Sequence, residues 1–118
     1  MRSHKSLIAW QVAREVVSGT LDATSSHWHP SKRNVFDQLE RAALSVQLNI
    51  AEGYARGAPK PFRNHLRIAY ASSVELSELL EIVGRKSLIP RGHARQLYVL
   101  SRRAQALILA LLRSIREK

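Results

Sequence analysis

The sequence predicts an all-α fold, an antiparallel up-down-up-down four-helix bundle, from three observations. Apolar residues recur every three or four positions along most of the 118-residue chain, which is the period of an amphipathic helix. Proline and glycine interrupt this pattern at Pro30, from Gly57 to Pro61 and from Gly84 to Gly92. The apolar–polar alternation of a half-buried strand does not run for any useful length. Four amphipathic helices with short connections pack most simply as such a bundle.

We expect the four helices to span residues 6–23, 31–55, 59–84 and 90–117. A polar segment rich in serine and histidine, residues 24–34, connects the first two. Pro59 and Pro90 suit the first turn of a helix, where a missing N–H costs nothing. Gly84 suits the position just after a helix end. Together these elements make residues 1–118 a single domain, as the chain length also favours.

The composition excludes several classes of protein. There is no cysteine, which excludes disulfides, thiolate metal sites and thiol chemistry. No apolar run reaches the roughly 18 residues of a membrane-spanning helix, and no signal-peptide core is present. We therefore expect a cytoplasmic protein with no membrane partner.

The net charge of +10 is high for this length and unevenly distributed. Residues 1–58 contain seven Lys or Arg against five Asp or Glu, whereas residues 59–118 contain twelve against four. From Arg85 onward, nine basic residues meet a single acid, Glu117. This asymmetry favours a polyanionic partner, with RNA or DNA ahead of an acidic membrane surface. A basic face that only keeps the protein soluble is the other interpretation.

The arginines of the last expected helix are ordered along it. Arg95 and Arg102 lie seven residues apart and Arg116 fourteen further on, on the side opposite the apolar stripe. A row of guanidinium groups contacts successive phosphates with little sequence preference. The expected nucleic-acid contacts on this helix and, as a second pair, on the third are Arg91, Arg95, Arg102, Arg103, Arg113, Arg116, Arg63 and Arg67.

The last helix also carries more apolar surface than one core requires. Residues 106–112 are apolar all the way round, whereas a helix that serves one core needs a single stripe. We expect the core to take Leu107, Ile108, Leu111 and Ile115. Four residues then remain outside it as a predicted oligomer interface: Tyr98, Val99, Leu109 and Leu112. Single exposed leucines are also ordinary on monomers, which is the alternative.

A strip of polar residues follows the second helix. Its members are spaced at four, four, three and four residues and are Arg41, Ser45, Asn49, Glu52 and Arg56. Ser45 and Asn49 border the apolar face, where half-buried polar groups need partners. Glu75, Ser72 or Ser73 on the third helix would supply them, and Glu52 would pair with Arg56 or an arginine across the bundle. We expect a structural network here, and a ligand pocket is the alternative.

The segment that contains this strip resembles a family signature. Residues 41–56 read RAALSVQLNIAEGYAR, similar to the signature of the four-helix-bundle proteins encoded by intervening sequences in 23S ribosomal RNA genes. Phe62, the stretch HLRIAYASSVEL at 65–76 and the opening Leu7 to Ala13 also match. The departure is in the first loop, where His27-Trp28-His29-Pro30 stands in place of the family's Phe-Pro.

This resemblance implies an antiparallel four-helix protomer. In related proteins such as the accessory protein of diversity-generating retroelements, it implies a homopentameric barrel. That accessory protein is basic and works with a reverse transcriptase and nucleic acid. For most members of the family no biochemical activity is established.

Other chemistry finds little support in the sequence. Glu75, Glu78 and Glu81 recur at three, but bundle di-metal sites also need a Glu-x-x-His pair, which the chain lacks. No glycine-rich phosphate loop and no recognisable nucleophile–base arrangement is present. We therefore expect no enzyme activity, no metal and no cofactor.

Two functional interpretations follow. The first is a non-enzymatic oligomeric bundle whose basic surface binds RNA or DNA with little sequence specificity, alongside a protein partner. The second is an oligomeric scaffold or protein-interaction module with no nucleic-acid role.

Overall fold

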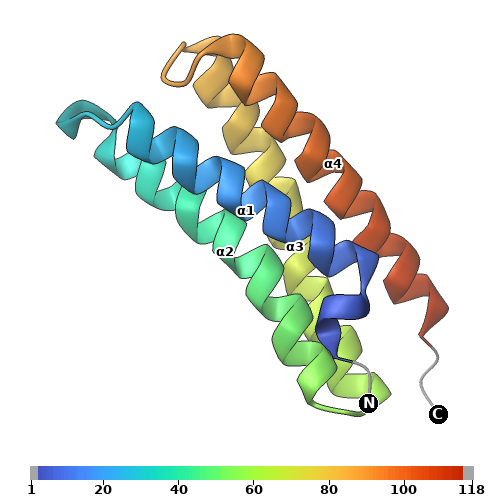
Figure 1. The fold of residues 1–118 in the computed structure, drawn as a ribbon. Helices are drawn as coiled ribbons and strands as arrows, with labels where there is room; N and C mark the ends of the chain where they lie inside the picture. The colour runs from blue at the N-terminus through green and yellow to red at the C-terminus, as the bar shows by residue number, and fades with distance from the viewer. Residues whose placement is uncertain (1–2, 116–118) are drawn as a thin grey trace.

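The computed structural model describes residues 3–115 as a bundle of four long helices (Figure 1). They are α1 (Ile8–Ser26), α2 (Arg33–Ala55), α3 (Pro59–Arg85) and α4 (Arg91–Ser114), with short 3-10 helices η1 (His4–Ser6) and η2 (Pro30–Lys32) before α1 and α2. Both α1 and α3 pack on α2 and α4, so the helices surround one core in chain order. The predicted all-α antiparallel bundle is confirmed.

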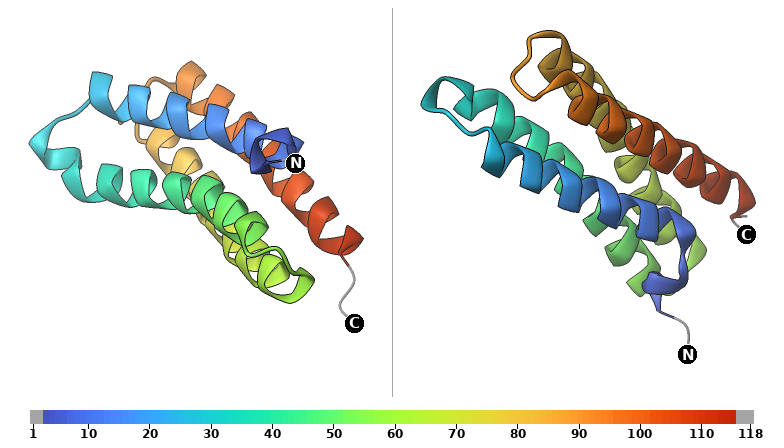
Figure 2. Two further views of the ribbon diagram at one scale, coloured as in Figure 1. Left: turned by 60° about the horizontal axis from the view of Figure 1, so that its bottom comes forward. Right: turned by 45° about the horizontal axis from the view of Figure 1, so that its top comes forward.

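The bundle is long and narrow, measuring 48 × 21 × 20 Å. The α1–α2 and α3–α4 connections lie at one end, and the α2–α3 connection lies at the other (Figure 2). Within residues 3–115, no helix is both long and apolar enough to cross a bilayer.

The first connection is shorter than the expected polar segment 24–34. Helix α1 continues to Ser26 and α2 begins at Arg33, so most of that segment is helical. Thr24 explains the extension, because it is fully buried and its Oγ1 donates to Glu40 Oε2 of α2 at 2.6 Å. At the other end of the chain, α4 stops at Ser114, and residues 116 and 117 of the expected 90–117 helix lie outside the described residues.

The core contains large side chains from all four helices, and at one close contact between helices there is no room for a side chain. Its largest fully buried side chains include Val16, Phe36, Leu39, Ile50, Leu66, Leu76, Leu80 and Ile108. At Gly53 of α2, an added Cβ would lie only 2.6 Å from the Cβ of His65. Helices α2 and α3 can therefore approach this closely only because position 53 has no side chain.

Helix α4 is rotated from its expected orientation, and the interface assignment of Leu112 is wrong. Its buried stripe is Ala94, Leu97, Ser101, Ala104, Ile108 and Leu112. Leu112 is only 8% exposed and belongs to the core, whereas Leu107 and Leu111 are half-buried at the edge. The reason is that small residues form half of the stripe, so the large apolar residues alone do not locate its centre.

Arg63 has a structural contact that the sequence did not suggest. From the first turn of α3, its Nη1 donates to the backbone oxygens of Leu112 and Ile115 at the end of α4. The last carbonyls of a helix lack partners within the helix, and a cation there is favourable. We therefore assign Arg63 to the fold instead of the nucleic-acid surface.

The contact of Arg63 predicts that replacing this arginine lowers stability more than replacing the nearby Arg67. Arg63→Gln should lower the free energy of unfolding by about 1–3 kcal/mol, because charge-assisted hydrogen bonds to the α4 carbonyls are lost. Arg67→Gln is the matched control. Within residues 3–115, exposed Arg67 bonds only to Asn64 of its own helix, so its loss should change stability by less than about 0.5 kcal/mol. Urea unfolding measures both. Equal stability of the two variants would contradict the capping role.

Candidate nucleic-acid interface

Helix α4 presents a surface that is basic along its whole length. Its sequence contains five arginines and no Asp or Glu. All five are exposed, and we call them the α4 arginine face: Arg91, Arg95, Arg102, Arg103 and Arg113. The sixth arginine expected on this helix, Arg116, lies outside the described residues.

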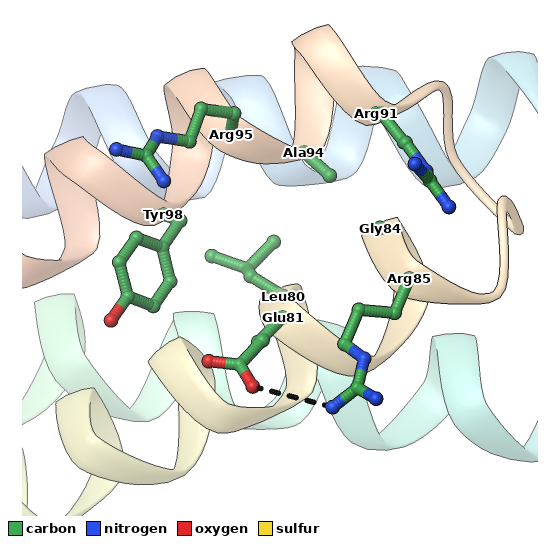
Figure 3. Close-up of a pocket in the computed structure, with 8 residues that line it drawn as sticks. All are labelled: Leu80, Glu81, Gly84, Arg85, Arg91, Ala94, Arg95 and Tyr98. Atoms are coloured by element: carbon green, nitrogen blue, oxygen red, sulfur yellow. Dashed lines mark ion pairs between the residues drawn. The ribbon is translucent and has the colours of Figure 1, made fainter.

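Four of these arginines form one row. Arg91, Arg95, Arg102 and Arg113 are separated by 4, 7 and 11 residues, all close to multiples of the 3.6-residue turn. The row spans about 33 Å at 1.5 Å per residue. It runs along the α3 side of α4, because Arg91 and Arg95 line a pocket together with Arg85 of α3 (Figure 3).

The charge of this face is not neutralised by nearby acids. Among residues 3–115, no carboxylate lies within 4.0 Å of the five guanidinium groups. Arg102 instead donates to the Tyr98 hydroxyl at 3.1 Å, with its guanidinium 5.9 Å from the ring centroid. Four of the five guanidiniums therefore have all their donors open to solvent or to a ligand.

Arg85 is a member of this region that the sequence did not assign. It ends α3, outside the last expected helix, and lies beside the first turn of α4 only after the chain reverses. The sequence does place Arg85 directly before a short connection, which indicates that it lies near the start of the next helix. Of the second expected pair, Arg67 is exposed and its Nη1 donates to Asn64 Oδ1 at 3.0 Å.

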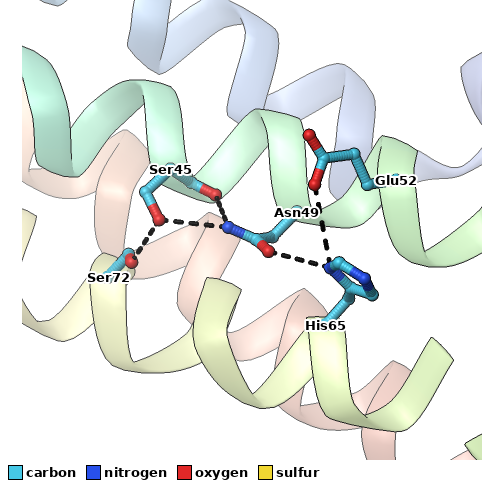
Figure 4. A network of polar contacts seen from close by, with 5 residues as sticks. All are labelled: Ser45, Asn49, Glu52, His65 and Ser72. Atoms are coloured by element: carbon cyan, nitrogen blue, oxygen red, sulfur yellow. Dashed lines mark hydrogen bonds and ion pairs between the residues drawn. The ribbon is translucent and has the colours of Figure 1, made fainter. Parts of the chain in front are cut away.

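The polar strip of α2 joins α2 to α3 through a chain of hydrogen bonds (Figure 4). The hydroxyls of Ser45 and Ser72 share a hydrogen bond of 2.7 Å. Asn49 Nδ2 donates to the backbone oxygen of Ser45 at 2.9 Å and to its hydroxyl at 3.2 Å. The other end of the amide, Asn49 Oδ1, lies 2.9 Å from His65 Nδ1. Because an amide oxygen only accepts, His65 Nδ1 carries the proton.

The charged ends of the strip are less involved. Glu52 is 63% exposed, and its carboxylate lies 3.9 Å from His65 instead of pairing with the expected Arg56. Glu75 accepts from Gln38 Nε2 at 3.2 Å, while Arg41 and Arg56 are exposed. His65 is the member that sequence reasoning missed, because its position opposite Asn49 depends on the register between two helices.

Within residues 3–115, no three His, Asp or Glu side chains gather closely enough to hold a metal ion. The half-buried side chains of the network donate to and accept from one another, which is the arrangement of a structural contact.

The network predicts that a substitution at its half-buried centre lowers stability more than one at its exposed end. Asn49→Leu removes the partner of both Ser45 and His65 and should cost about 1–3 kcal/mol of unfolding free energy. Glu52→Ala removes only a long, exposed ion pair and should cost less than about 1 kcal/mol. Thermal melts of the two variants test this. An Asn49→Leu protein that melts with the wild type would show that the network contributes nothing to stability.

Comparisons with known proteins agree with the fold. The family model described as 23S rRNA-intervening sequence protein matches residues 5–110. A solved structure from Bacteroides thetaiotaomicron, described as a protein of unknown function from the S23 ribosomal protein family, superposes with a TM-score of 0.64 at 20% identity, over 87% of this chain and 99% of the other. No curated protein sequence matches the chain. Because the family model covers nearly the whole sequence, the chain belongs to the 23S rRNA-intervening sequence protein family.

Proposed function

We propose that this protein is a non-enzymatic, oligomeric helical bundle that binds RNA or DNA through the α4 arginine face with little sequence specificity. The observation that carries the proposal is the α4 arginine face itself, five exposed arginines on a helix without an acid. Guanidinium groups match phosphate geometry and displace condensed counterions, which yields affinity for any strand.

Two further observations support this proposal. The net charge of +10 attracts polyanions over distances beyond direct contact. The description of the matching family names a ribosomal RNA, which makes RNA the first ligand to test.

The proposal predicts a salt-dependent affinity that depends on α4. Replacing Arg95, Arg102 and Arg103 with glutamine removes three phosphate contacts while keeping helix propensity. The variant should bind every sequence more weakly, and its plot of log affinity against log salt should be less steep by about 2 to 3. Fluorescence anisotropy with mixed-sequence RNA and DNA at several salt concentrations provides the measurement.

A matched control removes the same charge from another helix. Arg33 and Arg41 are exposed on α2, and Arg56 is exposed directly after its end. Helix α2 does not contact α4, so replacing these three with glutamine gives the same net charge away from α4. This control should keep most of the affinity. Equal losses in both triple variants would mean that net charge alone attracts the strand. No binding by the wild type at low salt would remove the nucleic-acid function and favour the scaffold.

We also propose that the chain forms a closed ring, with five subunits as the resemblance implies. Of the predicted interface residues, Val99 is 53% exposed, whereas Tyr98 and Leu109 are half-buried. The larger apolar side chains exposed on α2 and α3 are Leu44, Leu48, Ile68 and Ile82. A ring needs two different surfaces that meet head to tail, and the aliphatic groups of α2 and those of α3 supply two such surfaces without covering the α4 arginine face.

The ring predicts a mass of about five times 13.3 kDa by light scattering coupled to size exclusion. Leu48→Lys should dissociate it, because a lysine in an apolar interface loses its hydration without gaining a partner. The matched control is Leu21→Lys on α1, at a residue that is also exposed but outside the proposed contact. A wild-type mass near 13.3 kDa at micromolar concentration contradicts the ring.

A further inference from the structure

A pocket of about 420 Å³ lies between the last turns of α3 and the first two turns of α4 (Figure 3). We call it the α3–α4 pocket, and its lining residues are Leu80, Glu81, Gly84, Arg85, Arg91, Ala94, Arg95 and Tyr98. Leu80, Gly84 and Ala94 are buried, so the floor is apolar, whereas the charged residues are exposed at the rim. The volume lies within the usual range of small-ligand sites.

The rim of this pocket favours an anion. Three guanidinium groups meet a single carboxylate there, and that carboxylate, Glu81, lies 3.9 Å from Arg85. Among the described residues, Arg91 and Arg95 have no acidic partner. They lie one turn apart on α4, where like charges repel each other, and an anion between them relieves that repulsion.

The pocket also offers a surface to a flat apolar group. Tyr98 forms one wall, next to the buried Leu80, and Arg95 reaches from α4 on the same side (Figure 3). Arg102 holds the Tyr98 ring through the hydroxyl contact of 3.1 Å. Aromatic rings held in this way are the platforms on which unpaired bases stack. A free phosphate would occupy the rim and leave the ring and floor uncovered.

We propose that the α3–α4 pocket binds one nucleotide unit of a single-stranded nucleic acid. Arg91 and Arg95 hold its phosphate, and its base lies against Tyr98. This inference rests on the nucleic-acid function proposed above and adds a strand preference to it. A base in a duplex is already stacked and paired, so it cannot enter the pocket, whereas a single strand can turn a base outward.

The experiment compares one labelled RNA sequence as a single strand and as a duplex, by fluorescence anisotropy at fixed low salt. Wild-type protein should bind the single strand more tightly by about 5- to 100-fold, the usual effect of one stacked base. Exchanging both Arg91 and Arg95 for glutamine, or Tyr98→Leu, should remove the preference. Tyr98→Phe should keep it, because the ring remains.

The matched control is the double exchange of Arg103 and Arg113 for glutamine, which removes two exposed charges of the same helix outside the pocket. It should weaken both strands alike and leave their ratio unchanged. Because Arg91 and Arg95 are exposed, their variant should fold even where Tyr98→Leu does not, and thermal melts check this.

A competition experiment distinguishes recognition of a whole nucleotide from recognition of phosphate alone. Adenosine monophosphate should displace the labelled single strand from the wild type at a lower concentration than inorganic phosphate does. Equal displacement by the two competitors overturns the inference, as does equal binding of both strand forms or a pocket variant that keeps the preference. Those results leave the general nucleic-acid function standing. Absence of any binding overturns that function and the inference with it.

Discussion

The packing of one stripe of α4 into the core, around a buried hydrogen bond between Ser77 of α3 and Ser101 of α4, accompanies the exposure of its opposite face. The two hydroxyls lie 2.9 Å apart, and both serines are buried, so neither group has water as an alternative partner. Ser101 also lies 3.4 Å from the backbone oxygen of Ser73. With Ser101 at the centre of the contact, Leu112 turns inward and the α4 arginine face turns outward. The exposure of the α4 arginine face, on which the proposed binding depends, therefore follows from which residues of α4 enter the core.

Helix α3 packs differently on α2 and on α4. The contact with α2 mainly stabilises the fold, whereas the contact with α4 includes the proposed binding surface. Toward α2, α3 packs closely against Gly53 and joins the network of Ser45, Asn49 and His65. Toward α4, it packs through the paired serines but opens at one end into the α3–α4 pocket. The first contact has polar groups that satisfy one another. The second has free volume and unpaired cations, which are the properties of a binding surface.

The sequence predicts the fold class and fails where a result depends on the register between helices. Its apolar period defines four helices, but the phase of α4 was misjudged because Ala94, Ser101 and Ala104 bury no large side chain. Spacing along α2 identified Ser45 and Asn49 as a polar strip, yet His65 belongs to another helix and no periodicity places it opposite them. Arg63 shows the same limit, since its partners lie at the far end of the chain.

Ser3 and Ile115, the first and last described residues, border a common cleft at the end of the bundle remote from the α3–α4 pocket. Helix α4, whose 24 residues span about 36 Å at 1.5 Å per residue, separates this end from Arg91. An affinity tag, dye or fused reporter joined to the chain beyond Ser3 or Ile115 therefore connects to the bundle at the end opposite the proposed ligand. Immobilised through that end, the molecule presents the pocket outward to whatever flows past it.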